Sequence, residues 1–373
     1  MNPEVRIAVL VRPGLAFGRE VIRGIARYAR QQPHWRLHSM VPYDPVPPRR
    51  WIADGGIGHT PPDDWHGLLG DGAPRVLVGF TAPAEAAQVS SNDTEIARLG
   101  VDHLIGLGLR NVVFAGEADS VRGVAFQAAM QAAEQRLLLM PPDLARSAQV
   151  GHTPPIEAIA AWLREAPKPL GVMAIHDVQA RLVSVACRIA DLRVPDDVAI
   201  LGIDNDELLC ELSDPPLSSI DHAMQEVGYE AAALLNRMLN GGPVERVILP
   251  PKRVVTRRST DVLAIDDPDV VAALRYIRTN GAQNISIDDV ARSIPAARRT
   301  LERRFKKVMG HSLLDEVLRV RVNTARNLLI TTDRPLPQVA ESSGFNSLKH
   351  FHEVFRRRMG VTPVAFRRKH QMR

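Results

Sequence analysis

Charged side chains share one face of a helix-forming segment near the end of the chain. Within residues 297–309, Leu301, Phe305 and Val308 recur with the spacing of a buried helical face. The side chains left on the outward face are Arg298, Arg299, Glu302 and Arg303. An arginine can donate two hydrogen bonds to one guanine, and a glutamate can accept from cytosine, so this face has the chemistry of base recognition in DNA. A solvated face held by salt bridges is the competing interpretation.

A second segment, residues 347–359, repeats this arrangement fifty residues later. Phe351, Phe355 and Met359 follow the spacing of a buried face, and Ser347 can cap the helix. The outward side chains are Leu348, Lys349, His352, Glu353 and Arg356. The leucine is placed to touch a thymine methyl group, and the arginine begins a basic run suited to phosphates.

Each of these helices follows a shorter helix and a tight turn. Residues 287–294 precede the first, with a break at Pro295, and residues 336–342 precede the second, with a turn at 343–344. This helix-turn-helix arrangement presents its second helix to the major groove of DNA. The helix predicted between the units, residues 313–331, would span roughly 28 Å. Because one DNA turn is about 34 Å, one chain can place two recognition helices in successive major grooves.

The charge of the chain is divided unevenly along its length. Residues 270–373 hold 21 Lys and Arg against 8 Asp and Glu, a net +13, whereas residues 1–269 hold 26 against 34, a net −8. Contacts to phosphate require Lys and Arg, so a basic module joined to an acidic one is expected of a DNA reader joined to a separate sensing domain. The run 367–369 adds basic side chains for phosphates. A basic face unrelated to nucleic acid is the alternative.

The longer, N-terminal part of the chain has a different pattern. Short runs rich in β-branched residues alternate with segments of helical period, which favours an α/β fold with helices on both faces of a parallel sheet. The runs lie at residues 6–11, 76–80, 111–115, 170–175 and 198–203. After an acidic, irregular stretch near 261–268 the runs end. We therefore predict a sensing domain over 1–262 and an all-helical domain over 263–373.

Polar residues at the ends of the predicted strands are the candidates for a ligand site. Ligands of open α/β sheets bind beyond the carboxyl ends of the strands, and a sugar needs several hydrogen-bond donors and acceptors. The candidates are Asp204, Arg122, His176, Asn92 and Asp177. Asp204 directly follows a strand and can hold two hydroxyls, and Arg122 supplies a fork of donors. An aspartate after a strand also often caps the next helix, which is the structural alternative for Asp177.

Other classes of function lack their sequence features. The N-terminal part contains neither a glycine-rich nucleotide-binding motif nor a serine-hydrolase motif, so we expect neither an enzyme nor a cofactor. His350 and His352 lack the spacing of a helical zinc site, so no metal is expected. The only cysteines, Cys187 and Cys210, fit no metal or disulfide pattern and favour a reducing cytoplasm. We find no export signal or membrane-length apolar run and expect neither export nor membrane insertion.

Residues 269–370 contain four stretches typical of one family of DNA-binding domains. The stretches are ISIDDVARSI, RRTLERRFKKVMG, ARNLLITTDRPLPQVAESSGF and FRRRMGVTPVAFRR. They resemble the DNA-binding domain of AraC-type regulators, which implies two helix-turn-helix units and a double-stranded DNA operator. The first unit departs from the family because Pro295 replaces a small residue in the turn and Ala297 replaces the usual capping Ser or Thr. The departures imply a less well ordered first unit.

Residues 5–260 carry a second set of familiar stretches. They include SSNDTEIARLGVDHLIGLGLRNVVFAG, SVRGVAFQAAM, RVPDDVAILGIDND and VILPPKRVVTRRST. These resemble the two-lobed, periplasmic-binding-protein-like sensing domain of LacI-type repressors. On that resemblance Arg122 and Asp204 match ligand-contacting residues of the family, and His176 stands where an Asn often occurs. The helix-turn-helix that precedes the sensor in those repressors has no counterpart at this N-terminus.

The order of the two domains is that of a family of pentose-operon regulators, which this chain resembles from end to end. That resemblance alone implies a pentose, xylose-like effector. We expect a dimeric, cytoplasmic transcription factor that activates pentose-utilisation genes with RNA polymerase as a partner. A repressor or dual regulator responding to another sugar, and a sugar-binding protein or enzyme without a regulatory role, are the alternatives.

Overall fold

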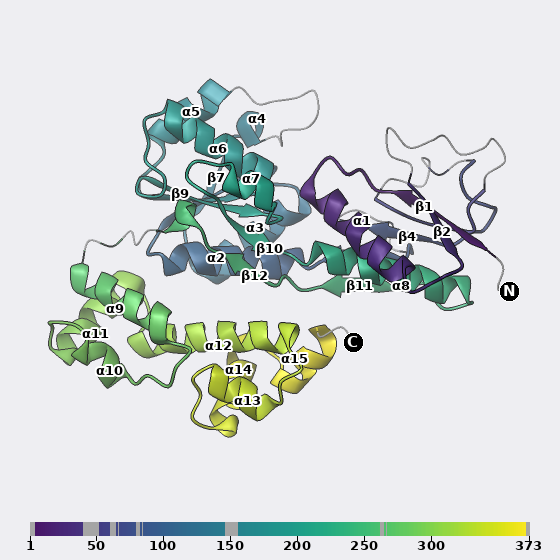
Figure 1. Cartoon of the computed structure of the whole chain (residues 1–373). Helices are drawn as coiled ribbons and strands as arrows, with labels where there is room; N and C mark the ends of the chain where they lie inside the picture. The colour runs from purple at the N-terminus through teal and green to yellow at the C-terminus, as the bar shows by residue number, and fades with distance from the viewer. Residues whose placement is uncertain are drawn as a thin grey trace.

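The computed structural model describes residues 4–39, 52–59, 65, 67–79, 83, 85–145, 156–261, 265 and 267–370. The chain forms two α/β lobes, between which it crosses more than once, and a helical domain lies against the second lobe (Figure 1). None of the described helices combines the length and apolar composition of a membrane span. The predicted domain boundary between residues 262 and 263 touches residues outside the described ranges.

The first lobe is built on a parallel sheet that in the described residues has six strands, ordered β11-β5-β4-β3-β1-β2. Its elements are β1 (Val5–Leu10), α1 (Ala16–Ala29), β2 (Trp35–Ser39), β3 (Gly55–Gly58), β4 (Arg75–Val78), β5 (Gln88–Ser91), α8 (Met224–Leu239) and β11 (Arg246–Leu249). Helices α1 and α8 approach closely through glycines. A Cβ atom on Gly24 would lie 2.0 Å from the carbonyl oxygen of Gln225, and one on Gly228 would lie 2.0 Å from that of Val21. The two helices can pack only because both positions lack a side chain.

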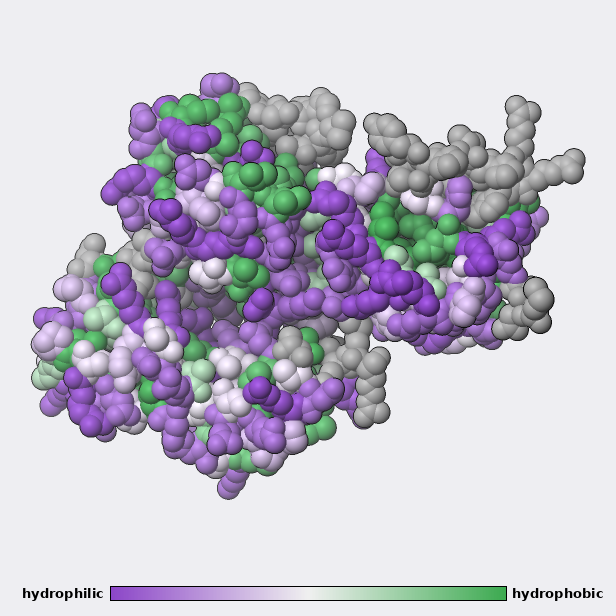
Figure 2. All heavy atoms as spheres, in the orientation of Figure 1, coloured by the Kyte–Doolittle hydropathy of each residue, from purple (hydrophilic) through white to green (hydrophobic). Residues whose placement is uncertain are grey.

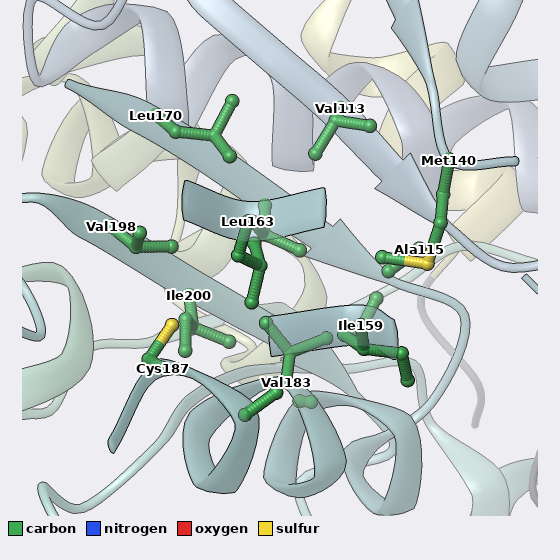
Figure 3. Packing of buried hydrophobic residues seen from close by; sticks show 14 of the residues in the cluster. Val113, Ala115, Met140, Ile159, Leu163, Leu170, Val183, Cys187, Val198 and Ile200 are labelled. Atoms are coloured by element: carbon green, nitrogen blue, oxygen red, sulfur yellow. The ribbon is translucent and has the colours of Figure 1, made fainter. Parts of the chain in front are cut away.

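The second lobe contains a six-stranded sheet in the described residues, ordered β12-β10-β9-β8-β6-β7, with only β12 antiparallel. Its strands are β6 (Asn111–Ala115), β7 (Leu137–Leu139), β8 (Leu170–Ala174), β9 (Val198–Ile203), β10 (Ser218–Asp221) and β12 (Arg253–Val255). Its helices are α2 (Asp93–Gly106), α3 (Val121–Ala132), α4 (Pro142–Ala145), α5 (Ile156–Glu165), α6 (Asp177–Ile189) and α7 (Glu207–Glu211), followed by a 3-10 turn at Arg258–Thr260. One core fills the space between the sheet and α5 and α6, where Val113, Leu170 and Val198 face Ile159, Leu163 and Cys187 (Figure 3). Both cysteines are buried.

The β-branched runs predict the strands that are buried on both faces. All five predicted runs correspond to strands, with ends that differ by at most two residues. The predicted run 76–80 ends at residue 80, which lies outside the described residues. Short or polar strands gave no such signal, and β3, with the sequence GGIG, is an example. Its glycines leave room for a tryptophan, because a Cβ on Gly56 would lie 2.0 Å from Cζ3 of Trp65. A strand whose packing partner is a large side chain elsewhere in the chain has no local apolar pattern.

The described chain crosses between the lobes at three places. These crossovers are residues 91–93, 221–224 and 249–253, because β5 and β11 belong to the first sheet while β10 and β12 belong to the second. Hydrogen bonds tie the crossovers together: Asn92 N donates to Leu249 O at 2.7 Å, and Lys252 N donates to Asp221 O at 2.7 Å. Three adjacent crossovers form a hinge for lobe movement.

The C-terminal domain is entirely helical in the described residues, as predicted. Its helices are α9 (Pro268–Asn280), α10 (Ile287–Arg292), α11 (Arg298–Met309), α12 (Leu313–Thr331), α13 (Leu336–Ser342), α14 (Leu348–Met359) and α15 (Pro363–His370). Two separate cores lie on the two halves of α12, so each helix-turn-helix unit has its own core. Arg321 joins them, because its guanidinium donates to the carbonyl oxygen of Ile285 at 2.7 Å and lies 5.9 Å over the ring of Phe345.

Candidate ligand cleft and nucleic-acid interface

Asp204 occupies an unusual backbone conformation at the end of strand β9. Its φ angle is 113° and that of Asn205 is 51°, although neither residue is glycine. Its amide donates to the carbonyl oxygen of Ile220 in the neighbouring strand β10 at 3.1 Å. A non-glycine residue in such a conformation costs on the order of 1–3 kcal/mol, and such residues cluster at functional sites. The backbone at Asp204 is therefore an indication of function that no sequence pattern carries.

The carboxylate of Asp204 is buried beside two basic groups. His222 Nε2 lies 2.9 Å from Oδ1, and Arg122 Nη1 lies 3.8 Å from the same atom. Burial acts to raise the pKa of this carboxyl, but the hydrogen bond and charge of His222 and the charge of Arg122 outweigh it, so the pKa is lowered. Asp204 is thus a buried anion able to accept hydrogen bonds from hydroxyls.

Arg122, at the start of α3, is fixed by two further partners. Its Nε donates to Asp93 Oδ1 at 3.0 Å, and Nη1 donates to the carbonyl oxygen of Ile175 at 2.6 Å. The helix start that positions it is capped by Ser120, whose hydroxyl accepts from the amide of Gly123 at 3.0 Å. The structure therefore brings Arg122 and Asp204 together, as the sequence predicted, and adds Asp93 as an unpredicted buried partner.

His176 lies beside this pair at the end of β8. Its Nδ1 accepts from the amide of Gln179 at 3.0 Å and so caps α6. Burial is the main cause that lowers its pKa, and the charge of Arg122 adds to this against the opposing charge of Asp204. The ring is therefore neutral at pH 7, with its Nε2 as the hydrogen-bond donor. Its role in ligand binding stays a prediction.

Asp177 makes its hydrogen bonds inside the second lobe. Its carboxylate accepts from the amide of Asp206 at 2.7 Å and from the hydroxyl of Ser219 at 2.6 Å. The space for it is supplied by Gly202, because a Cβ there would lie 2.0 Å from its Oδ1. Burial, followed by the charge of Asp204, raises its pKa from 3.8 to about 8. These contacts are those of a residue that fixes the β9–α7 turn.

Asn92 serves chiefly as a helix cap on the first crossover. Its side-chain oxygen accepts from the amide of Glu95 at 3.1 Å, which satisfies the free end of α2. Its side chain is half-buried, and contact with a ligand stays a prediction.

Sequence reasoning missed an aromatic and imidazole cluster beside Asp204. His222, on the second crossover, is fully buried, and the hydroxyl of Ser91 lies 2.7 Å from its Nδ1. Phe17 stacks on His222 at 6.3 Å between ring centroids with an 8° angle between planes, and its ring also lies 6.3 Å from that of His59. Aromatic walls with a few placed polar groups are typical of small-molecule sites. These residues come from four distant segments, so only the fold brings them together.

A cavity of about 500 Å³ adjoins Asp204 between the lobes. Its walls are the start of α1, the β9–α7 turn, the start of α8 and Lys252. Across it, Arg19 Nη2 of the first lobe pairs with Asp206 Oδ2 of the second at 2.6 Å. Of the predicted ligand residues, Asp204 lines this cavity, and Nη1 of Arg122 lies 3.8 Å from its carboxylate. The lobes are therefore in contact beside a polar space large enough for a monosaccharide.

The first recognition helix, α11, presents a partly neutralised face. Arg299 and Arg303 are exposed and pair with no described acidic residue, whereas Arg298 pairs with Asp288 at 2.5 Å and with Glu302 at 3.0 Å. Ala297 provides no side-chain cap, as expected from the sequence. The helix nevertheless forms, because its apolar face is buried in its own core.

One detail of α11 differs from the prediction. Met309, rather than Val308, completes the buried face with Leu301 and Phe305, and Val308 is half-buried at its edge. The carbonyl oxygen of Val308 accepts from Arg110 of the sensing domain at 2.8 Å. The buried residues of α11 follow one another at intervals of four, so the third buried position falls on Met309. Val308, one residue earlier, therefore lies at the edge of the buried face.

The second recognition helix, α14, matches its prediction closely. Its start is capped by the hydroxyl of Ser347, which accepts from the amide of His350 at 3.1 Å. The predicted outward residues are exposed at Leu348, Lys349, Glu353 and Arg356 and half-buried at His352. Phe351 and Phe355 are fully buried, and Met359 packs at the edge of the same core. The surface of the C-terminal domain is predominantly hydrophilic in the view of Figure 2.

Comparisons with known proteins agree with this division of the chain. Residues 101–260 match the periplasmic binding protein-like domain family, and residues 290–369 match a helix-turn-helix domain family. A xylose operon regulatory protein of Escherichia coli K12 is 28% identical, covering 97% of this chain and 96% of its own length. One of Haemophilus influenzae Rd is 34% identical but covers 57% of this chain and 55% of its own length.

Solved structures show the same arrangement. The structure of a xylose-binding transcription activator has a TM-score of 0.60 and 27% identity, and the match covers 100% of both chains. The sensing domain alone resembles a LacI family regulator from Enterococcus faecium with bound ribose, at a TM-score of 0.54 and 23% identity, covering 68% of this chain and 98% of that chain. At that identity the second likeness concerns the fold.

Proposed function

This chain joins a periplasmic-binding-protein-like sensing domain to an AraC-type helix-turn-helix domain, and from that premise we propose that it is a sugar-responsive, DNA-binding regulator of xylose utilisation. The observation that carries the proposal is the buried cluster of Asp204, Arg122 and His222 between two lobes that share a hinge. The end-to-end similarity to xylose operon regulators supports the choice of sugar.

The proposed ligand contacts divide between polar and aromatic groups. Asp204 accepts from two sugar hydroxyls, Arg122 donates to a third, and the neutral His176 donates through Nε2. The rings of Phe17 and His222 pack against the apolar face of the sugar ring. Both lobes thereby contact one ligand, so binding favours the closed arrangement of the lobes.

The DNA contacts come from α11 and α14. Exposed Arg299 and Arg303 on the first helix and Lys349 on the second read base edges, and Arg356 binds phosphate. The net +13 of residues 270–373 attracts the duplex. As part of the same proposal, the regulator acts in the cytoplasm as a homodimer and activates transcription by contacting RNA polymerase.

A thermal-shift series tests the sugar half of the proposal. Purified protein is heated with D-xylose, L-arabinose, D-ribose and D-glucose, and a ligand present at 100 times its Kd stabilises by about 2.7 kcal/mol. We expect D-xylose to raise the unfolding midpoint most. No shift with any pentose would overturn the assignment of the sugar class, and consumption of a sugar by the protein would favour an enzyme instead.

A DNA-binding series tests the other half. The full chain is mixed with random duplexes, bound fragments are selected over several rounds, and the affinity for the selected duplex is measured with and without D-xylose. We expect the sugar to change that affinity. A selected pool without any common sequence would contradict specific operator recognition.

A further inference from the structure

The DNA-binding domain holds the hinge of the sensing domain through one buried arginine. Arg326, in the second half of α12, is 2% exposed. Its Nη2 donates to the carbonyl oxygens of Pro251 and Lys252 at 3.5 and 3.3 Å. Both carbonyls belong to the third crossover between the lobes, residues 249–253.

That crossover is connected to the candidate ligand cleft by short hydrogen bonds. Lys252 N donates to the carbonyl oxygen of Asp221, on the second crossover, at 2.7 Å. The next residue there is His222, whose Nε2 lies 2.9 Å from the carboxylate of Asp204. A contiguous path thus runs from Asp204 through His222 and Lys252 to Arg326, and so from the cleft to the helix that carries both helix-turn-helix units.

Three other contacts of this seam reach the second lobe. Arg278 of α9 donates to the carbonyl oxygen of Gly106 at the end of α2. Arg110, just after α2, donates to Val308 O at 2.8 Å, and Nη2 of Arg98 lies 3.8 Å from Sδ of Met359. Figure 1 shows the C-terminal domain along α2 and β12. The contacts of Arg326 differ from these three in reaching the hinge.

The surroundings of Arg326 suit a contact between domains that move relative to one another. Burial lowers its pKa to about 10, with Arg98 adding to this and Glu95 and Asp102 opposing it, so the group stays charged at pH 7. A buried charge needs hydrogen-bond partners, and the crossover carbonyls supply them. A polar cavity of about 190 Å³ adjoins this arginine at the seam. The seam is polar and incompletely packed, as expected of domains that move relative to one another.

We propose that Arg326 transmits lobe closure to the DNA-binding domain by holding the third crossover. The inference rests on the proposed function and assigns it a route of regulation. When the lobes close on a sugar, the crossover rotates relative to the second lobe, on which the rest of the seam is anchored. Arg326 keeps its carbonyl bonds only if α12 follows the crossover. The sugar thereby favours one orientation of the recognition helices, and DNA that binds this orientation favours the sugar reciprocally.

Three variants of the full chain test this. Arg326→Leu removes every donor to the crossover, Arg326→Lys keeps the charge but not the forked geometry, and Arg110→Ala removes a seam contact that does not touch the hinge. The probes are D-xylose and the duplex selected by the wild-type protein. The quantity measured is the ratio of the duplex Kd without D-xylose to the Kd with it, and coupling of this kind usually amounts to about 5–150-fold.

We expect the ratio to fall to near 1 in Arg326→Leu while D-xylose still binds, to be reduced in Arg326→Lys, and to keep its wild-type value in Arg110→Ala. A wild-type ratio in Arg326→Leu would overturn the inference. Circular dichroism checks folding, and if the leucine variant does not fold, the reduced ratio of Arg326→Lys decides: an unreduced ratio there overturns the inference.

A ligand-free measurement separates this inference from the proposed function. If the wild-type protein itself shows no response to D-xylose, the proposed function fails. Hydrogen exchange at the amide of Lys252 then tests the contact alone. We expect exchange to be faster in Arg326→Leu than in the wild type or in Arg110→Ala, because the crossover has lost its anchor. Unchanged exchange would overturn the inference whatever the sugar does.

Discussion

At the scale of single residues, two neighbouring aspartates have been given opposite properties by their surroundings. Asp204 faces His222 and Arg122, and its pKa is lowered, whereas burial and the charge of Asp204 raise the pKa of Asp177 to about 8. Two carboxylates that interact in this way are driven apart in pKa, because both cannot easily carry charge in one buried space. The charged one is the better ligand for sugar hydroxyls.

The raised pKa of Asp177 predicts a pH dependence of stability. The folded state holds a proton that the unfolded state releases near pH 4, so this contribution to stability is lost as pH rises toward the folded pKa of about 8. Asp177→Asn has no proton to lose, and Ser219 can accept from its amide. We expect the stability of Asp177→Asn relative to wild type to increase from pH 6 to 8, on the order of 1 kcal/mol per unit. Urea unfolding at several pH values measures this, and a pH-independent difference would contradict it.

Replacing the other aspartate tests the ligand site. Asp204→Ala is expected to abolish stabilisation by D-xylose, because it removes the buried acceptor between the lobes, while basal DNA binding persists in a separate domain. Calorimetry with D-xylose measures the loss, and the selected duplex provides the control. Unchanged sugar affinity would remove Asp204 from the site.

At the scale of elements, the two recognition helices differ in how their charges are used. Arg298 on α11 is held by Asp288 and Glu302, so it must break ion pairs to reach DNA. Lys349 and Arg356 on α14 are exposed, and the helix is fixed by a capped start and two buried phenylalanines. A rigidly supported helix whose charged side chains form no ion pairs loses less free energy to ordering and desolvation when it contacts bases.

This difference predicts two kinds of effect on α14. Lys349→Ala should weaken the selected duplex by about 1–3 kcal/mol and a scrambled duplex far less, since a base contact carries sequence information. Arg356→Ala should weaken both duplexes about equally, because phosphates are the same in each. Both side chains are exposed, so stability should stay within about 0.5 kcal/mol of wild type. Binding curves on both duplexes decide, and equal losses from Lys349→Ala would refute base readout by that residue.

At the scale of the whole molecule, the excess of positive charge lies in one domain and the candidate ligand cleft lies in another. The C-terminal domain holds the excess of basic residues and has two cores of its own, while the candidate ligand cleft and the crossovers between the lobes belong to the sensing domain. The two are connected by a polar seam in which Arg326 reaches the hinge. Separate folding with a limited contact is what allows one domain to change the orientation of another.

The separation predicts that the fragment 266–373 binds DNA without the sensor. Its affinity should fall steeply with salt, with a logarithmic slope of roughly −0.9 for each phosphate neutralised. It should not respond to D-xylose, because the cleft is absent. Titrations of a duplex between low and moderate salt measure the slope, and a flat response would exclude this domain as the DNA reader.

The sequence by itself determined the local structure and indicated which part of the chain is the sensing domain and which the DNA-binding domain. The strands buried on both faces, the helices of the two helix-turn-helix units with the helix between them, and the outward faces of α11 and α14 follow from apolar periodicity and capping residues, which act within a few turns of chain. The uneven distribution of charge predicted which domain reads DNA, because charge can be counted along the sequence without knowing any three-dimensional contact. Arg122 and Asp204 were predicted to lie together because ends of parallel strands meet at one edge, and the structure places them 3.8 Å apart.

Only the tertiary structure decided which distant residues meet. Phe17, Ser91 and His222 come from separate segments and have no shared spacing, and the strained backbone of Asp204 has no signature in residue type. Arg326 looks in the sequence like any arginine on a helix, yet it is buried against the hinge. Which side chains are buried, and which hydrogen-bond partners they have, depends on how the domains pack. The free energy of that packing is spread over contacts between segments far apart in the chain.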